Sequence, residues 1–143
     1  MRGTRWVAVT AGLMLAATAC GGGANREPDV EVGMAEMAIW TDGDVPTGTS
    51  VWKVHNSGDA HHNLTICEGA VGGCEGPNIE QTVLEHEPTA RDEDALPDVT
   101  DALVLGSGWT NLIEVELAPG TYRLWCAVPN HAVKGMDTEV TVG

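Results

Sequence analysis

From Val30 to the end of the chain, apolar and polar residues alternate in short runs that stop at turn-forming residues. Val30, Val32 and Met34, for example, occupy every second position. A period of two places successive side chains on opposite faces of a β-strand. Turn-forming sequences separate the runs, among them Asp42-Gly43-Asp44, Asn56-Ser57-Gly58-Asp59 and Ala118-Pro119-Gly120. The pattern predicts an all-β sandwich of short strands rather than a helical fold.

The clearest strands are expected at residues 51–56, 62–66, 112–117, 121–126 and 138–142. Residues 75–108 are the least regular part, because acidic residues interrupt any apolar period: Glu85, Glu87, Asp92, Glu93, Asp94, Asp98 and Asp101. This segment is predicted to be a solvated surface excursion, within which residues 79–84 could form a short helix. An acidic docking patch is the alternative interpretation.

The first twenty residues have the form of an export signal. Arg2 and Arg5 flank the start of an apolar run over residues 6–19, which is too short to span a membrane comfortably. The small residues before Cys20 resemble the lipobox of bacterial lipoproteins, although Ala17 stands where Leu is more common.

This resemblance implies a signal peptide over residues 1–19, a lipid attached to Cys20, and a Gly-rich linker over residues 20–29. One domain follows over residues 30–143. Cleavage at a nearby Ala-x-Ala site is the alternative. The expected location is extracytoplasmic, in the cell envelope, with a lipid anchor in the membrane.

The chain is strongly acidic, with a formal net charge of −14. Nucleic acid and anionic lipid headgroups are therefore poor partners, whereas cationic protein surfaces fit such a charge. The acidity also serves solubility. A monomer is expected.

The chain has four cysteines. With Cys20 acylated, three remain in an oxidising compartment, where two can pair and one is left over. Cys67 and Cys74 flank a short Gly-rich loop and are predicted to form a disulfide. Cys126 is then the unpaired thiol, which a bound metal would protect from oxidation.

Cys126 opens a Cys-x4-His-x4-Met sequence that continues with His131 and Met136. A copper ion that alternates between Cu(I) and Cu(II) favours a soft thiolate, imidazoles and a weak thioether. Zinc is a poorer fit, because a thioether is a poor zinc ligand and the chain has no Cys-x2-Cys pair. The loop therefore predicts three ligands of one mononuclear copper.

The second imidazole is expected from the adjacent pair His61 and His62. Strand parity favours His62, because it is in phase with the apolar residue Ile66, whose side chain must face the core. His61 then points to the rim. His55 and His86 are expected on the surface.

Together these motifs resemble the cupredoxins, the family of type 1 blue copper proteins. Plastocyanin-like members share an Asn-x-Gly turn before His-Asn and a Gly-x-Tyr strand before the cysteine, here Asn56-Ser57-Gly58, His62-Asn63 and Gly120-Thr121-Tyr122. The loop spacing, with Val128-Pro129 before the histidine, is most similar to rusticyanin-like proteins. The resemblance implies a Greek-key β-sandwich and one type 1 copper, whose ligands would be His62, Cys126, His131 and Met136.

The resemblance also implies that Asn63 ties the two ligand-bearing segments together by hydrogen bonds. Many relatives have Ser or Thr directly after the cysteine to meet this side chain, but this chain has Ala127. One contact near the thiolate is therefore expected to be lost. Fewer hydrogen bonds to the thiolate favour Cu(I), so a high reduction potential is expected.

The function implied is transfer of single electrons between redox partner proteins in the cell envelope. Electrons are expected to pass through the exposed edge of His131, with Trp125 as a second exit. An apolar patch is expected around His131, made of Val128, Pro129, Ala132 and Val133. Copper storage or delivery is the alternative function.

No enzyme activity is expected, because four ligands fill the site and leave no open coordination position. A binuclear copper centre would need a second cysteine between Cys126 and His131, and none is there. Trp125 stands where multicopper oxidases have a histidine.

Overall fold

The computed structural model describes residues 26–87 and 103–143. The predicted signal peptide, Cys20, most of the linker and the acidic residues from Asp92 to Asp101 lie outside these ranges. Within the described ranges, no helix is long and apolar enough to cross a membrane.

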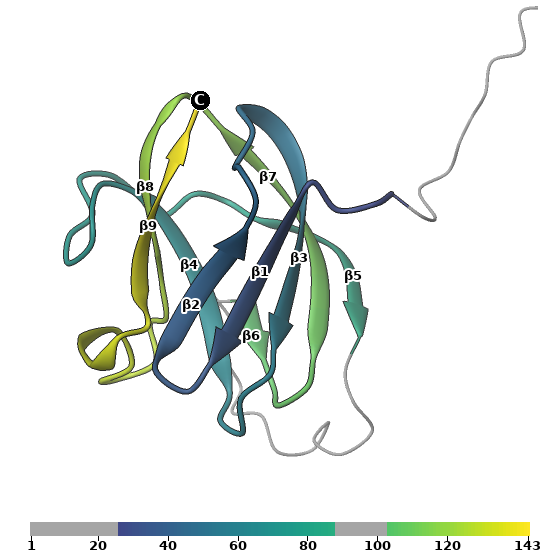
Figure 1. The fold of residues 1–143 in the computed structure, drawn as a ribbon, viewed down its shortest axis with the longest axis vertical. Helices are drawn as coiled ribbons and strands as arrows, with labels where there is room; N and C mark the ends of the chain where they lie inside the picture. The colour runs from purple at the N-terminus through teal and green to yellow at the C-terminus, as the bar shows by residue number, and fades with distance from the viewer. Residues whose placement is uncertain (1–25, 88–102) are drawn as a thin grey trace, which may run out of the picture.

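The described strands form two sheets that pack face to face (Figure 1). The five-stranded sheet has the order β2-β1-β3-β7-β5, and the four-stranded sheet has the order β6-β4-β8-β9. The strands of the first sheet are β1 (Val30–Ala35), β2 (Ala38–Asp42), β3 (Gly48–Asn56), β5 (Thr82–Glu87) and β7 (Thr110–Leu117). Those of the second are β4 (His62–Glu68), β6 (Leu103–Leu105), β8 (Gly120–Trp125) and β9 (Asp137–Val142).

The strand connections identify the topology. β1 runs parallel to β3, and every other pair of neighbouring strands is antiparallel. From β3 to β8 the chain changes sheet at every step, so strands that are consecutive in sequence lie in different sheets. The all-β Greek-key sandwich predicted from the sequence is confirmed.

The alternation of apolar residues places one face of each inner strand in the core. Val30, Val32 and Met34 of β1 are all buried, and so is Trp52 of β3. The Trp52 indole N–H donates to the Ser50 hydroxyl at 2.8 Å, so its polar atom is satisfied inside the sandwich. Each large apolar side chain buried in this way stabilises the fold by about 1.5–3 kcal/mol.

The short helix allowed over residues 79–84 is wrong, because this segment leads into strand β5. β5 pairs antiparallel with β7, with a register shift between Val83 and Glu85. All six residues of β5 are exposed, so a helix here would have no face to bury. β-branched Thr82 and Val83 instead favour the extended chain, and β7 offers backbone hydrogen bonds.

Candidate metal centre

Three predicted ligands meet at one end of the sandwich, where β4 begins and β8 ends (Figure 1). His62 Nδ1 lies 3.1 Å from His131 Nδ1, and Cys126 Sγ lies 3.6 Å from the same His131 nitrogen. The three ligand atoms all lie within 4.8 Å of one another. In residues 26–87 and 103–143, no other group of three His, Cys, Asp or Glu residues comes together in this way.

Strand pairing fixes the ends of the ligand loop, residues 126–136. β8 pairs with β9 so that Trp125 lies opposite Asp137. Cys126 and Met136 are the next residues outward, and the Cys126 N–H donates to the Met136 carbonyl at 3.0 Å. The loop therefore starts and ends on one backbone hydrogen bond that holds two predicted ligands side by side.

Inside the ligand loop, turns replace strand pairing. The His131 N–H donates to the Val128 carbonyl at 3.0 Å, and the Met136 N–H donates to the His131 carbonyl at 3.1 Å. The 3-10 turn η1 (Ala132–Lys134) follows Asn130, which has a φ of 67°. Asn tolerates this left-handed conformation better than most residues. The loop thus fixes the backbone of His131 and Met136 by its own hydrogen bonds.

Burial distinguishes His131 from the other three predicted ligands. His62, Cys126 and Met136 are each 0% exposed, whereas His131 is half-buried. Met136 belongs to the main core cluster. Among these four residues, only His131 has access to solvent.

The two adjacent histidines differ as strand parity predicts. His62 is buried at the start of β4, while His61 is half-buried and is not part of the close group of ligand atoms. His55 is half-buried and His86 is exposed, and each hydrogen-bonds a side chain of β7.

Asn63 links β4 to the ligand loop in two ways. Its backbone N–H points at the Cys126 sulfur over 3.5 Å, and its side-chain oxygen accepts a hydrogen bond from the Ala127 N–H at 2.6 Å. Asn63 therefore still bonds position 127 through the backbone N–H, while a contact with a Ser or Thr hydroxyl has no counterpart at Ala127.

Burial shifts the pKa values of two predicted ligands. Desolvation raises the pKa of the Cys126 thiol, against the effect of two backbone N–H groups that point at the sulfur. Desolvation also lowers the pKa of His62, as does the neighbouring His131, while Glu36 opposes this shift. His62 is therefore a neutral imidazole with a lone pair for a metal at neutral pH, and Cys126 releases a proton when a metal binds.

The donor atoms fit a single copper ion. Two of the distances between the donor atoms are 3.1 and 3.6 Å, and all lie within 4.8 Å, which suits metal–imidazole and metal–thiolate bonds of about 2.0–2.3 Å. The Nδ1 atoms of the two imidazoles lie 3.1 Å apart, so one cation can bind both when neither carries a proton. One thiolate, two imidazoles and one thioether are the ligand types of type 1 copper, and all but one imidazole are on the ligand loop.

Residues 29–143 match the family described as copper binding proteins, plastocyanin/azurin family. The chain belongs to this family. The cupredoxin resemblance is thus confirmed, and copper is the metal of the site. A search of the curated proteins finds no match.

Solved structures similar to this cupredoxin include dithionite-reduced auracyanin from the photosynthetic bacterium Roseiflexus castenholzii. The two are 27% identical, with 79% of this chain and 94% of that chain covered and a TM-score of 0.48. Multicopper oxidases from Campylobacter jejuni and Pediococcus acidilactici are 13% and 18% identical, with TM-scores of 0.57 and 0.52. These alignments cover 85% and 79% of the cupredoxin but only 31% and 25% of the oxidases, and they show a shared fold alone.

The predicted electron-transfer patch is on the ligand loop of the cupredoxin, on both sides of His131. Val133 is 85% exposed, Pro129 is exposed and Ala132 is half-buried. Val128 is half-buried and packs against the core. The patch is therefore apolar at the surface and anchored at its base.

The cupredoxin also contains a disulfide between Cys67 and Cys74, whose Cα atoms are 5.6 Å apart. Cys126 is buried and is the free cysteine among the described residues. The pairing and the unpaired thiol are those that the cysteine spacing predicts.

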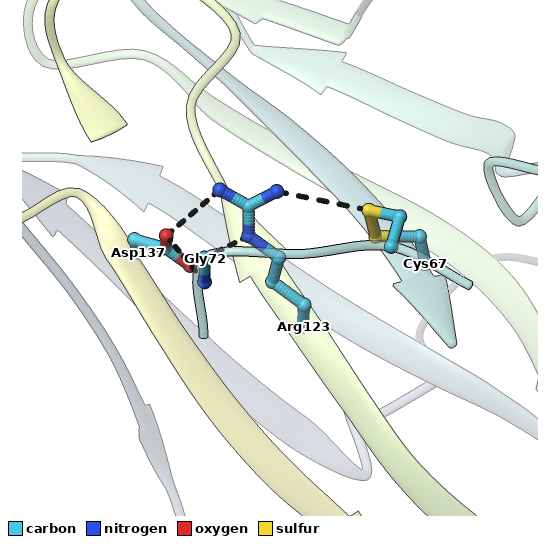
Figure 2. The surroundings of a disulfide bond; sticks show 5 residues. Cys67, Gly72, Arg123 and Asp137 are labelled. Carbon is cyan, nitrogen blue, oxygen red and sulfur yellow. Dashed lines mark hydrogen bonds and ion pairs between the residues drawn. A yellow bond between two sulfur atoms is a disulfide. The ribbon is translucent and has the colours of Figure 1, made fainter. Parts of the chain in front are cut away.

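A part-buried ion pair lies next to the disulfide, and the sequence analysis did not identify it (Figure 2). Arg123 Nε and Nη2 donate to the two carboxylate oxygens of Asp137 at 2.8 and 2.7 Å. The Gly72 N–H also donates to this carboxylate, at 3.1 Å. The guanidinium carbon of Arg123 lies 4.5 Å above the ring centre of Trp125, and Nη1 lies 3.7 Å from Cys74 Sγ. The predicted second exit, Trp125, is therefore covered on one face by a cation.

Proposed function

We propose that this cupredoxin carries single electrons between redox partner proteins, with one copper held by His62, Cys126, His131 and Met136. The observation that carries the proposal is that three of these residues are fully buried, with the ligand loop closed by its own backbone hydrogen bonds. A site held in this way keeps its ligands in place in both oxidation states, which favours fast electron exchange. A bound copper supplies the one-electron chemistry.

Electrons are proposed to enter and leave at His131. This residue is the half-buried member of the ligand set, and exposed Val133 and Pro129 lie on the same loop. Apolar residues around an exposed imidazole edge let a partner exclude water where the two proteins touch. Trp125 is the proposed second exit, with Arg123 over one face of its ring.

The proposed redox partners are proteins with a cationic surface. The net charge of −14 supports this choice, because opposite charges speed the encounter of two proteins and orient them. Such association is expected to slow as salt is added.

We also propose that the chain is not an enzyme. Four ligands from one chain leave no coordination position for a substrate. Trp125 precedes Cys126 where multicopper oxidases have a histidine, so the route to a second copper cluster has no equivalent at this position.

The proposed location is the cell envelope, with a lipid on Cys20. The Cys67–Cys74 disulfide supports an oxidising compartment. Mass spectrometry of protein extracted from membranes should find a diacyl or triacyl group on Cys20, and Cys20→Ala should release the protein from the membrane fraction. An unmodified Cys20 in the membrane fraction contradicts the anchor.

The experiment that tests electron carriage compares electron exchange with copper release. In mixtures of the Cu(I) and Cu(II) forms, NMR line broadening should show fast electron self-exchange, and a moderate Cu(I) chelator should remove little copper. Slow self-exchange together with ready loss of Cu(I) to the chelator would contradict the carrier and indicate copper storage or delivery.

A further inference from the structure

The turn between β1 and β2 contacts the segment that leads into His62. The carboxylate of Glu36, in this turn, accepts hydrogen bonds from the backbone N–H groups of Asp59 and Ala60, the latter at 3.0 Å. Ala60 lies two residues before His62, which is the first residue of β4. The carboxylate thus holds the chain immediately before a copper ligand.

Gly58 makes room for this carboxylate. A Cβ atom at position 58 would lie 2.6 Å from Glu36 Oε1 and 2.8 Å from Oε2, which is closer than real Cβ atoms approach. A side chain at this position would require the Glu36 carboxylate to move from where it accepts these hydrogen bonds. The segment is therefore shaped around Glu36.

Asn56 fixes the same segment from its buried side. Its amide nitrogen donates to the carbonyls of Ala60, Leu105 and Gly106 at 2.8, 3.0 and 3.1 Å, and its oxygen accepts the Gly58 N–H at 2.9 Å. These bonds tie the segment to the core. Glu36 lies on the opposite, exposed side of this segment. There its carboxylate accepts the hydrogen bonds of the Asp59 and Ala60 N–H groups.

The same turn also touches the ligand loop. The carbonyl oxygen of Met37 lies 2.5 Å from the place where a Cβ at Gly135 would be, and Gly135 has a φ of 125°. Gly135 directly precedes Met136. The β1–β2 turn, residues 36 and 37, therefore contacts both chain segments that carry predicted copper ligands.

Glu36 acts on the site through its charge as well as through its hydrogen bonds. The Ala60 N–H has the largest effect in lowering the pKa of this carboxyl, and Glu36's own N–H has the next largest. The carboxyl is therefore ionised at neutral pH. The carboxylate is bonded to the chain immediately before His62, which is the first residue of β4, so its negative charge lies near the metal site. A negative charge in this place favours the more highly charged Cu(II) over Cu(I).

We propose that Glu36 is a positioning residue for His62, which anchors the segment before this ligand through Asp59 and Ala60, and that its negative charge lowers the reduction potential of the copper. The inference deepens the proposed electron carriage, because it names a residue that sets the potential at which electrons are exchanged. The turn contributes no copper ligand in this proposal.

Two variants distinguish the effect of the Glu36 charge on the potential from the anchoring by its hydrogen bonds. Glu36→Gln keeps an acceptor oxygen at the same reach and removes the charge, whereas Glu36→Ala removes both. Glu116→Gln is the matched control, because Glu116 is an exposed residue of β7 at the opposite end of the sandwich.

Redox titration of the copper-loaded protein at low ionic strength tests the charge. Glu36→Gln should shift the Cu(II)/Cu(I) equilibrium about threefold toward Cu(I), or about 28 mV at 59 mV per tenfold change, and added salt should reduce the shift. The Glu116→Gln control should shift it far less. Equal potentials in the two Gln variants would overturn the electrostatic part.

Hydrogen exchange of the Asp59 and Ala60 amides in the metal-free protein tests the positioning. Both amides should exchange about tenfold faster in Glu36→Ala and near the wild-type rate in Glu36→Gln, since the Gln oxygen still accepts from them. Wild-type exchange in the Ala variant would overturn the anchoring part. Slow electron self-exchange in the wild-type protein would contradict the proposed electron carriage. The redox titration and the hydrogen exchange would still test the role of Glu36.

Discussion

The side-chain oxygen of Asn63 accepts a hydrogen bond from the backbone N–H of Ala127 at 2.6 Å. This bond joins the residue after His62 to the residue after Cys126, so it connects the two chain segments that supply the predicted copper ligands. Its donor is a backbone group, and for that reason the bond does not depend on which side chain follows the cysteine.

Removing the acceptor should therefore weaken the protein even without copper. Asn63→Ala leaves the Ala127 N–H without this partner, and the free energy of unfolding of the metal-free protein should fall by about 1–2 kcal/mol. Urea denaturation measures the change. Asn78→Ala, at an exposed position, is the control and should change stability by about 0.5 kcal/mol or less. An equal loss in both variants would show that the bond to Ala127 adds nothing to stability.

The colour of the copper-loaded protein should depend on Cys126 and not on His61. Absorption by a type 1 site arises from charge transfer between thiolate sulfur and Cu(II), so Cys126→Ser should lose the intense visible band. His61→Ala should keep it, because His61 is outside the close group of ligand atoms, whereas His62→Ala should lose it. A bleached His61 variant beside a coloured His62 variant would reverse the assignment of the first ligand.

The parts of the site that could be predicted from the sequence are those that depend on local spacing. His62 could be chosen over His61 because a period of two is visible within a few residues of β4. The Cys126, His131 and Met136 spacing is likewise contained in one loop. Local patterns of this kind survive folding because strand alternation and a closed loop need no knowledge of distant residues.

The parts that could not be predicted depend on strand register. Glu36 reaches Ala60 across 24 positions, and Arg123 reaches Asp137 across 14. Which residues lie opposite each other on two strands is not determined by the alternation of either strand alone. β5 was missed for a different reason: its six residues are all exposed, so it has no buried face and no alternation to detect.

The ion pair between Arg123 and Asp137 should contribute to stability because its side chains are largely shielded from solvent. The two side chains are 11% and 9% exposed, so Arg123→Met leaves a carboxylate without its cation in a site that water scarcely reaches. Unfolding free energy should fall by about 3 kcal/mol. Arg26→Met is the matched control, since the Arg26–Glu114 pair is 62% and 36% exposed and should contribute less than about 1 kcal/mol.

Chemical denaturation of both metal-free variants measures the difference. A loss at Arg123 no larger than that at Arg26 would mean that the buried pair is not a structural clamp. Adding Asp137→Leu to Arg123→Met should recover part of the loss, because the unpaired buried charge is then removed.

Substitution of Met136 tests its predicted role as the weak fourth ligand. The residue is 0% exposed, and its backbone is hydrogen-bonded to Cys126 and His131, so the loop should keep its shape when the side chain changes. Leu is close to Met in volume and should fold with a cost below about 1.5 kcal/mol. A thioether donor favours Cu(II) weakly, and Leu supplies no donor at all. Voltammetry of Met136→Leu should therefore show a higher potential, by roughly a tenfold change in the Cu(II)/Cu(I) equilibrium or about 59 mV, with the colour retained.

Met136→Gln should shift the potential in the opposite direction, because a harder amide oxygen stabilises Cu(II) more than a thioether does. Met34→Leu is the matched control for both, since Met34 is also 0% exposed but lies in β1 and not in the ligand loop. Its potential should remain at the wild-type value. Shifts of the same sign in the Leu and Gln variants, or an equal shift in the Met34 control, would indicate general loosening of the core and would remove Met136 from the ligand set. Opposite shifts with reversible voltammetry in both variants are what a donor atom at Met136 requires, because Leu removes that donor and Gln replaces it with a harder one.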